Sequence, residues 1–159
     1  MKSPTSSIEQ AGQISGAHLG ASRQISYALY GAANRMIRLH KPFLDPLGLT
    51  FPQYLVLLEL FAKSPRTVGE LGRKLGMDAG TITPLLKRLE VAGKVSRNRD
   101  KADERRVWID LTPAGEALRT SVWTLTDQIK SSCGLSDVDL DDLRQTLDTF
   151  SWPAPPGEE

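Results

Sequence analysis

TVGELGRKLGMDAGTITPLLKRLEVAGKVSRNRDKADERRVWIDL, residues 67–111, is the stretch that decides the fold. Thr67 and Glu70 have the spacing of a capping box, in which each side chain bonds the other residue's backbone N–H, so a helix begins there and ends at Gly76. A second helix follows and ends at Gly93. Two strands, 94–97 and 106–111, then flank the charged loop RDKADER. The stretch therefore predicts two helices followed by a hairpin.

The start of the second helix is open to two interpretations. Asp78 is a suitable N-cap, but it would place Pro84 inside the helix, where proline removes one backbone hydrogen bond. Thr83 as the cap would make Pro84 an ordinary first residue, and local chemistry favours this second interpretation. Four apolar residues recur at helical spacing and should face the core: Ile82, Leu85, Leu86 and Leu89.

The hairpin ends in a strand of alternating character. Val107, Ile109 and Leu111 alternate with polar Asp110, and Trp108 is the exception to the alternation. The loop before this strand is long enough to project from the domain as a wing.

Outward from this centre, the chain divides into five segments. Residues 1–21 form a mobile arm, and 22–50 hold a helix of apolar periodicity that ends at Asp45-Pro46-Leu47-Gly48. Residues 51–112 form the central domain, whose first helix is opened by Thr50 and Gln53 and is apolar nearly all round. Residues 113–150 hold a helix from Thr112-Pro113 to about Ser131 and a last helix from Ser136, while 151–159 are a disordered tail. The last helix should turn five apolar residues inward: Val138, Leu140, Leu143, Leu147 and Phe150.

The bulk composition excludes several classes of protein. The 159 residues are 40% hydrophobic and 25% charged, as in an ordinary globular protein. No apolar run approaches the roughly 20 residues of a membrane span, and the N-terminus has no signal-peptide core, so we expect a cytoplasmic protein. Cys133 is the single cysteine, which excludes an intrachain disulfide.

Charge is unevenly distributed although the net charge is only +1. Bases outnumber acids between Lys87 and Arg106, whereas acids dominate from Gly134 onward. Because duplex affinity depends on local neutralisation of phosphates, a nearly neutral total is compatible with DNA binding.

The order helix, helix, helix, hairpin describes a winged helix-turn-helix, mainly α with a small β-hairpin wing. Its exposed basic surface predicts contacts with a DNA duplex. Hydroxyls at the start of the recognition helix can bond bases or phosphates, and an arginine at the wing tip can enter the minor groove, held by Asp103. A solvated helix face and an exposed charged turn are the alternatives. The predicted DNA-binding residues are Thr81, Thr83, Lys87, Arg88, Arg97, Asp103, Arg105 and Arg106.

Catalytic and metal chemistry have no support in the sequence. His18 and His40 are isolated, and no Cys–His cluster, glycine-rich phosphate loop or Ser/His/Asp set is present. We therefore expect neither an enzyme nor a cofactor.

TITPLLKRLEVAG and DERRVWIDLTPAG resemble the MarR family of transcriptional regulators, and LDPLGLTFPQYLVLLELF resembles its branch that senses organic hydroperoxides. This resemblance covers residues 22–150. It implies a homodimer joined by the N- and C-terminal helices, a pseudo-palindromic DNA site, and a recognition helix that begins near Asp78.

The resemblance also implies a sensing site. Ser26 stands where that branch has its peroxidatic cysteine, and two tyrosine hydroxyls of the partner subunit correspond to Tyr30 and His40. Cys133 falls near the resolving cysteine of the two-cysteine type. A serine hydroxyl does not become a nucleophile toward peroxide without an activating base.

Several alternatives stay open from the sequence. Ser26 is either an introduced replacement that locks the reduced, DNA-binding state or the natural residue of a member that senses another signal. Cys133 is either an independent sensor or an inert buried thiol. A rival function is a regulator released by a phenolic or carboxylate ligand bound between the first helix and the central helix.

Overall fold

The structure is a computed structural model that describes residues 24–149. The predicted arm, the tail and Phe150 lie outside the described residues. Contacts divide the chain into two units, one up to Arg38 and one from Leu39 onward, which we describe separately. The first unit contributes the beginning of helix α1 (Ile25–Leu44), on which five large apolar side chains are exposed: Ile25, Tyr27, Tyr30, Met36 and Ile37.

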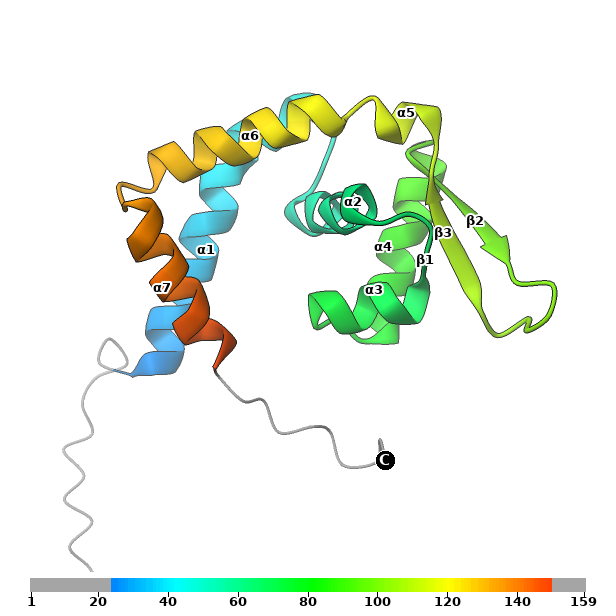
Figure 1. Cartoon of the computed structure of the whole chain (residues 1–159), viewed down its shortest axis with the longest axis horizontal. Coiled ribbons are helices and arrows are strands. Elements are labelled where there is room, and N and C mark those ends of the chain that lie inside the picture. The colour runs from blue at the N-terminus through cyan, green and yellow to red at the C-terminus, as the bar shows by residue number, and fades with distance from the viewer. Residues whose placement is uncertain (1–23, 150–159) are drawn as a thin grey trace, which may run out of the picture. The chain divides into compact units, whose positions relative to one another are not determined.

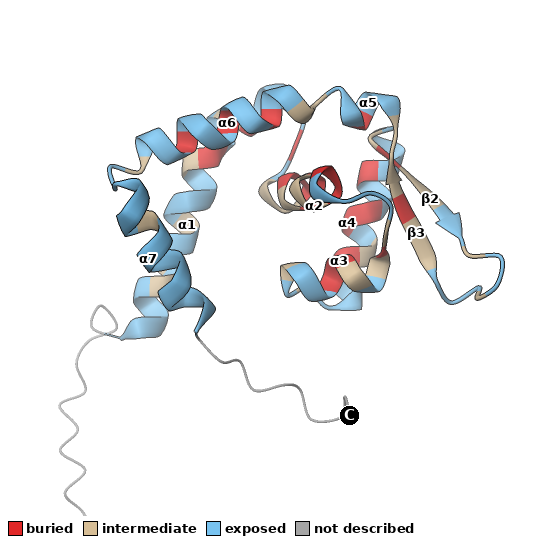
Figure 2. Cartoon of the chain, viewed as in Figure 1, coloured by how far each residue is buried: buried red, intermediate tan, exposed pale blue. Residues whose placement is uncertain are grey.

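The second unit opens with the end of α1, which stops where the sequence predicted. A 3-10 turn, η2 (Asp45–Leu47), follows it, and Gly48 then adopts a φ of 62°, which favours glycine. Helix α2 (Phe51–Ala62) begins at Thr50, whose backbone N–H donates to the Gln53 side chain at 2.9 Å. Val56, Leu57 and Leu60 are completely buried, so α2 is the centre of the core, as predicted (Figure 2).

Helices α3 (Val68–Leu75) and α4 (Ala79–Val91) pack beside α2 (Figure 1). The predicted capping box is present, since Glu70 accepts the Thr67 N–H at 2.7 Å and Thr67 accepts the Glu70 N–H at 3.2 Å. The local interpretation of Thr83 as the cap of α4 is wrong. Asp78 caps the helix by accepting the Thr81 N–H at 2.8 Å, and Pro84 lies inside it. Burial of the apolar residues on both sides of Pro84 outweighs the missing backbone bond.

A three-stranded antiparallel sheet has the order β1–β3–β2, with β1 (Arg66–Thr67), β2 (Val95–Arg99) and β3 (Val107–Leu111). The sequence missed β1, because two residues show no periodicity and Thr67 pairs with Trp108 only through the tertiary fold. The β2 strand also runs two residues beyond the predicted 94–97, since Arg99 still pairs with Val107. The wing loop is therefore 100–106.

The C-terminal region corrects two further expectations. The single helix predicted from Thr112 to about Ser131 is α5 (Pro113–Glu116) and α6 (Arg119–Ser132), separated where the Leu118 N–H bonds the Gly115 carbonyl at 3.1 Å in a tighter turn. Arg119 is held there by Glu116 and by the Phe61 carbonyl of α2, at 2.8 Å.

The last helix, α7 (Asp137–Asp148), carries no buried residue. Val138, Leu143 and Leu147 are exposed, so the inward face predicted for this helix is wrong for the single chain. The reason is that α7 contributes no side chain to the hydrophobic core of the second unit. Among residues 24–149, no helix is both long enough and apolar enough to cross a membrane.

Candidate nucleic-acid interface

The exposed side of α4 carries the predicted recognition residues. Because Ile82, Leu85, Leu86 and Leu89 are buried against the core, the opposite side of the helix faces solvent (Figure 2). Thr81, Lys87 and Arg88 are exposed, and Thr83 is half-buried. The Asp78 cap fixes the first turn of α4, and the helix carries two hydroxyls and two cations outside its buried stripe.

The wing carries a second cationic group. Figure 1 shows β2 and β3 leading to the loop 100–106, which extends beyond the sheet. The Arg105 side chain is 93% exposed there, and its Nε donates to Asp103 Oδ1 at 3.3 Å. Asp103 also accepts the Arg105 backbone N–H at 3.1 Å. The contact expected between these two residues is present as one hydrogen bond from the guanidinium, which stays almost wholly solvated.

Arg97 lies in a different environment from the other predicted DNA-binding residues. Its side chain is only 19% exposed and its Nη1 lies 3.5 Å from Glu90 Oε2 at the end of α4. Its Nε is buried without a hydrogen-bond partner. The structure therefore places Arg97 between β2 and α4, and a contact with DNA at this position stays a prediction.

Arg106 is exposed but belongs to a cluster that sequence reasoning missed. Its guanidinium lies 5.2 Å from the Trp108 ring centroid, and the Trp108 indole N–H donates to Asp100 Oδ2 at 3.0 Å. That hydrogen bond, followed by one from the Ala102 N–H, lowers the pKa of the Asp100 carboxyl below its ordinary value. The only sequence signal was Trp108 itself, the large aromatic that interrupts the alternation.

The side chains of α4 and the wing have the chemistry of a duplex-binding surface. An α-helix fits the major groove, where Thr81, Thr83, Lys87 and Arg88 can bond base edges and phosphates. A hairpin tip with an extended arginine suits the narrow, electronegative minor groove. Both α4 and the wing belong to the second unit. Arg97 of β2 does not share their exposure, because its side chain is mostly buried beside Glu90 of α4.

The residues of the predicted sensing site fall in both units. Ser26 is exposed and Tyr30 is 71% exposed on the first part of α1. In the second unit, His40 is only 5% exposed and its ring lies 4.9 Å from Phe51 and 5.3 Å from Tyr54. Cys133 is half-buried at the C-terminal end of α6, packed against the core.

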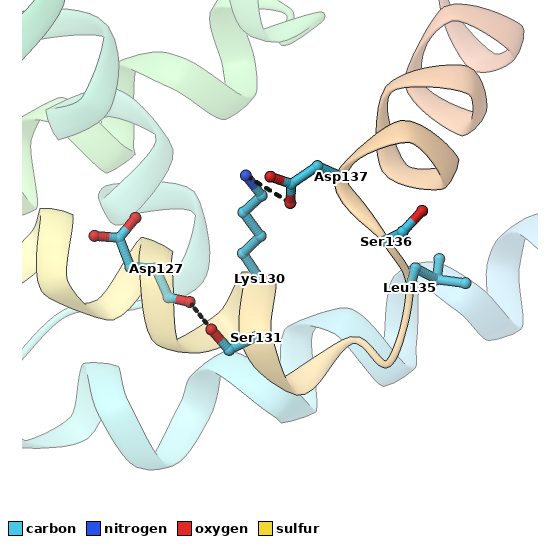
Figure 3. A pocket seen from close by; sticks show the side chains of 6 residues that line it. All are labelled: Asp127, Lys130, Ser131, Leu135, Ser136 and Asp137. Carbon is cyan, nitrogen blue, oxygen red and sulfur yellow. Dashed lines mark hydrogen bonds and ion pairs between the residues drawn. The ribbon is translucent and has the colours of Figure 1, made fainter.

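Two open pockets lie along α6. One is lined by Asp127, Lys130, Ser131, Leu135, Ser136 and Asp137 (Figure 3). Its cation is neutralised, because the Lys130 ammonium lies 2.9 Å from Asp137 Oδ1, which raises the pKa of Lys130. The other is lined by Phe43 and five residues of α6. Neither pocket is lined by α2, and residues 24–149 contain no group of three or more acidic, His or Cys side chains that would hold a metal ion.

Comparison with known proteins agrees with this geometry. A family model described as transcriptional regulator SarA/Rot matches residues 38–121. The organic hydroperoxide resistance transcriptional regulator of Bacillus subtilis is 38% identical over 133 residues, covering 84% of this chain and 90% of that protein. The regulator TtmR of Methylorubrum extorquens is 41% identical over 128 residues, covering 80% of this chain and 64% of TtmR.

Solved structures of similar fold also include a transcriptional regulator and a DNA-bound protein. A probable transcriptional regulator from Pseudomonas aeruginosa has a TM-score of 0.73 at 30% identity and covers 82% of this chain and 98% of its own. The structure titled reduced AbfR bound to DNA has a TM-score of 0.66 at 34% identity, over 80% of this chain and 91% of its own. This chain therefore belongs to the winged-helix transcriptional regulators of the MarR and SarA/Rot type, and it is a DNA-binding regulator, not an enzyme.

Proposed function

We propose that this chain is a homodimeric, cytoplasmic repressor of the organic-hydroperoxide type that remains in its DNA-binding form because Ser26 occupies the sensing position. The observation that carries the proposal is the combination of Ser26 on α1 with Cys133 as the one cysteine of the sequence. The 38% identity to a hydroperoxide resistance regulator supports the assignment to this branch. So do the similar solved structures of AbfR in its reduced, DNA-bound form and in its disulfide form.

The chemistry of the sensing step requires sulfur at position 26. A thiolate attacks the terminal peroxide oxygen, the O–O bond breaks and the sulfur becomes a sulfenic acid. The expelled alkoxide takes up a proton from solvent and leaves as an alcohol. A second thiol then attacks that sulfur and displaces water, which gives a disulfide. A serine hydroxyl cannot follow this route, since an alcohol without an activating base is a poor nucleophile and oxygen forms no equivalent of the sulfenic acid.

Cys133 does not replace the missing thiol in this proposal. It is half-buried against the core, and the helix end at which it lies presents carbonyls instead of N–H donors. The lysine nearest to it in the sequence, Lys130, is engaged by Asp137. We assign Cys133 the resolving role, which it can fill only when position 26 carries sulfur.

The homodimer is supported by uncovered apolar side chains on the terminal helices. Val138 is 69% exposed, Leu143 48% and Leu147 42%, all on α7, and Ile25 is 62% exposed on α1. A soluble regulator with such surfaces is expected to cover them with a second copy. Two linked recognition helices then require a pseudo-palindromic operator, so a change at the dimer interface changes operator affinity.

The experiment restores the thiol with Ser26→Cys and measures operator affinity by fluorescence anisotropy, before and after cumene hydroperoxide. The probe is the DNA upstream of the protein's own coding sequence. The Ser26→Cys protein should lose affinity and form a disulfide-linked dimer on non-reducing gels, whereas the unsubstituted chain and Ser26→Ala should do neither. Adding Cys133→Ser to Ser26→Cys should abolish the dimer band.

Three outcomes would overturn the proposal. Equal release of the unsubstituted chain by hydroperoxide would place the sensor elsewhere. Release by a phenolic or carboxylate compound, with Ser26→Cys insensitive to peroxide, would establish the ligand-controlled alternative. If no duplex is retained even at low salt, the DNA-binding surface itself is misassigned.

A further inference from the structure

Trp108 is a large aromatic residue on the outer face of the wing hairpin. Its neighbour Ile109 is completely buried, so the alternation of β3 directs Trp108 to the opposite face of the strand. Trp108 pairs with Asn98 of β2 and Thr67 of β1, in the middle of the sheet. A residue of this size is not needed there to complete the core, so its contacts indicate its role.

Those contacts join the two ends of the wing loop. The indole N–H of Trp108 donates to Asp100 Oδ2 at 3.0 Å, where the loop begins. The Arg106 guanidinium, where the loop ends, lies 5.2 Å from the Trp108 ring centroid. The backbone closes the same span, because the Asp100 N–H donates to the Arg106 carbonyl at 2.9 Å. One side chain thus holds both ends of the loop.

The inner turn of the loop is built on these ends. The second carboxylate oxygen of Asp100 accepts the Ala102 N–H at 2.8 Å. The Arg106 N–H donates to the Asp103 carbonyl at 2.9 Å, and the Asp103 carboxylate holds Arg105. Arg105 therefore lies between Asp103 and Arg106, which are joined by a backbone hydrogen bond, although its own side chain is almost wholly solvated.

We propose that Trp108, Asp100 and Arg106 form a wing clasp, in which Trp108 and Asp100 are positioning residues that preset the loop so that Arg105 meets the DNA minor groove. This inference rests on the proposed DNA-binding function and adds how the wing reaches its binding geometry. A loop ordered before binding loses less conformational entropy on the DNA than a free one, so the clasp raises affinity without touching the duplex.

Trp108→Phe distinguishes the hydrogen bond between Trp108 and Asp100 from the packing of an aromatic ring. Phenylalanine keeps an aromatic ring under Arg106 but removes the N–H that holds Asp100. Asp100→Asn tests the other partner, because its amide nitrogen would face one of two N–H donors. Asp110→Asn is the matched control, since the Asp110 carboxylate also accepts a side-chain donor, the Ser64 hydroxyl at 2.6 Å, but lies on β3 outside the wing loop.

The assay is anisotropy titration of a duplex that the protein selects from a random-sequence pool. Trp108→Phe and Asp100→Asn should each weaken binding about three- to tenfold, the range of a charge-assisted hydrogen bond in a partly solvated site, and their combination should cost no more than either alone. The control should bind as tightly as the unsubstituted chain. The amide of Ala102 should exchange its hydrogen faster in Trp108→Phe.

The decisive measurement repeats Trp108→Phe in a chain that already carries Arg105→Ala. If the clasp acts through Arg105, the second change should alter affinity by less than about twofold. An equal loss in both backgrounds would show that Trp108 contributes independently of Arg105 and would overturn the proposal, as would undiminished binding of Trp108→Phe. If the proposed DNA-binding function is itself wrong, the unsubstituted chain will select no duplex from the pool. That result is distinct from the two above, and it would refute the clasp proposal as well.

Discussion

Replacing Arg105 with alanine removes an almost fully exposed cation of the wing and little else. The side chain is 93% exposed, so its loss opens no cavity. Asp103, which it contacts, keeps the Arg105 backbone N–H as a donor. The free energy of unfolding should therefore change by less than about 0.5 kcal/mol, as for surface substitutions in general.

The effect on DNA binding should be larger. An arginine that contacts the duplex is worth about 1–3 kcal/mol, and each phosphate neutralised adds about 0.9 to the slope of log affinity against log salt. Arg105→Ala should therefore weaken binding by about 1–3 kcal/mol for each wing that contacts DNA. The slope of log affinity against log salt should become shallower by about 0.9 for each phosphate that the arginine had neutralised. Titrations at several salt concentrations measure both quantities on one preparation.

Arg144→Ala is the matched control, because it removes an exposed arginine of α7 whose ion-pair partners within residues 24–149 are acids of its own helix, Asp141 and Asp148. It should leave both affinity and salt slope unchanged. If Arg105→Ala and Arg144→Ala behave alike, the wing does not bind DNA and this part of the reasoning is refuted.

Two stability predictions follow from the helices that position the interface. Glu70→Gln should cost about 1 kcal/mol at neutral pH in urea unfolding, because Glu70 caps α3 through Thr67. Hydrogen bonds from the Thr67 N–H and hydroxyl lower the pKa of Glu70, so its stabilisation is present above the unfolded-state pKa and is lost on acidification. The gap between the two proteins should close from about pH 5 downward, and a gap independent of pH would contradict the capping account. Pro84→Ala should raise the melting temperature, since regaining a helical hydrogen bond outweighs the greater entropy of the unfolded chain by about 1–2 kcal/mol; a lower melting temperature would show that Pro84 is better placed than its chemistry suggests.

Local chemistry predicted the features whose signals lie within a few residues. The stop at Asp45-Pro46-Leu47-Gly48 and the Thr67–Glu70 box are of this kind, and both are present. The same local reasoning misplaced the start of α4, because it counted the cost of Pro84 inside a helix but not the burial of the apolar residues around it. Ile82, Leu85 and Leu86 are buried in the helix that contains Pro84, and their burial outweighs that cost. The family resemblance, which carries that tertiary information, indicated the correct cap.

Features held by distant residues were not predictable in this way. β1 exists because Arg66 and Thr67 pair with β3, more than 40 residues later in the chain. Arg97 belongs to the basic segment by sequence, yet Glu90 of α4 holds it at the junction with β2. The clasp depends on Asp100 meeting Trp108 across the hairpin, and the sequence showed only that Trp108 breaks the alternation. The apolar side chains of α7 were expected to face inward, yet no residue of this helix is buried.

The most direct test of the account is a footprint of the unsubstituted protein on its selected duplex, read by guanine methylation in the major groove and hydroxyl radicals in the minor groove. A dimer of winged helices predicts two protected major-groove segments about 10 base pairs apart, with minor-groove protection on their outer flanks. Arg105→Ala should remove the flanking protection and leave the central pair. A single protected segment, or flanking protection that survives Arg105→Ala, would contradict the paired recognition helices and the minor-groove wing.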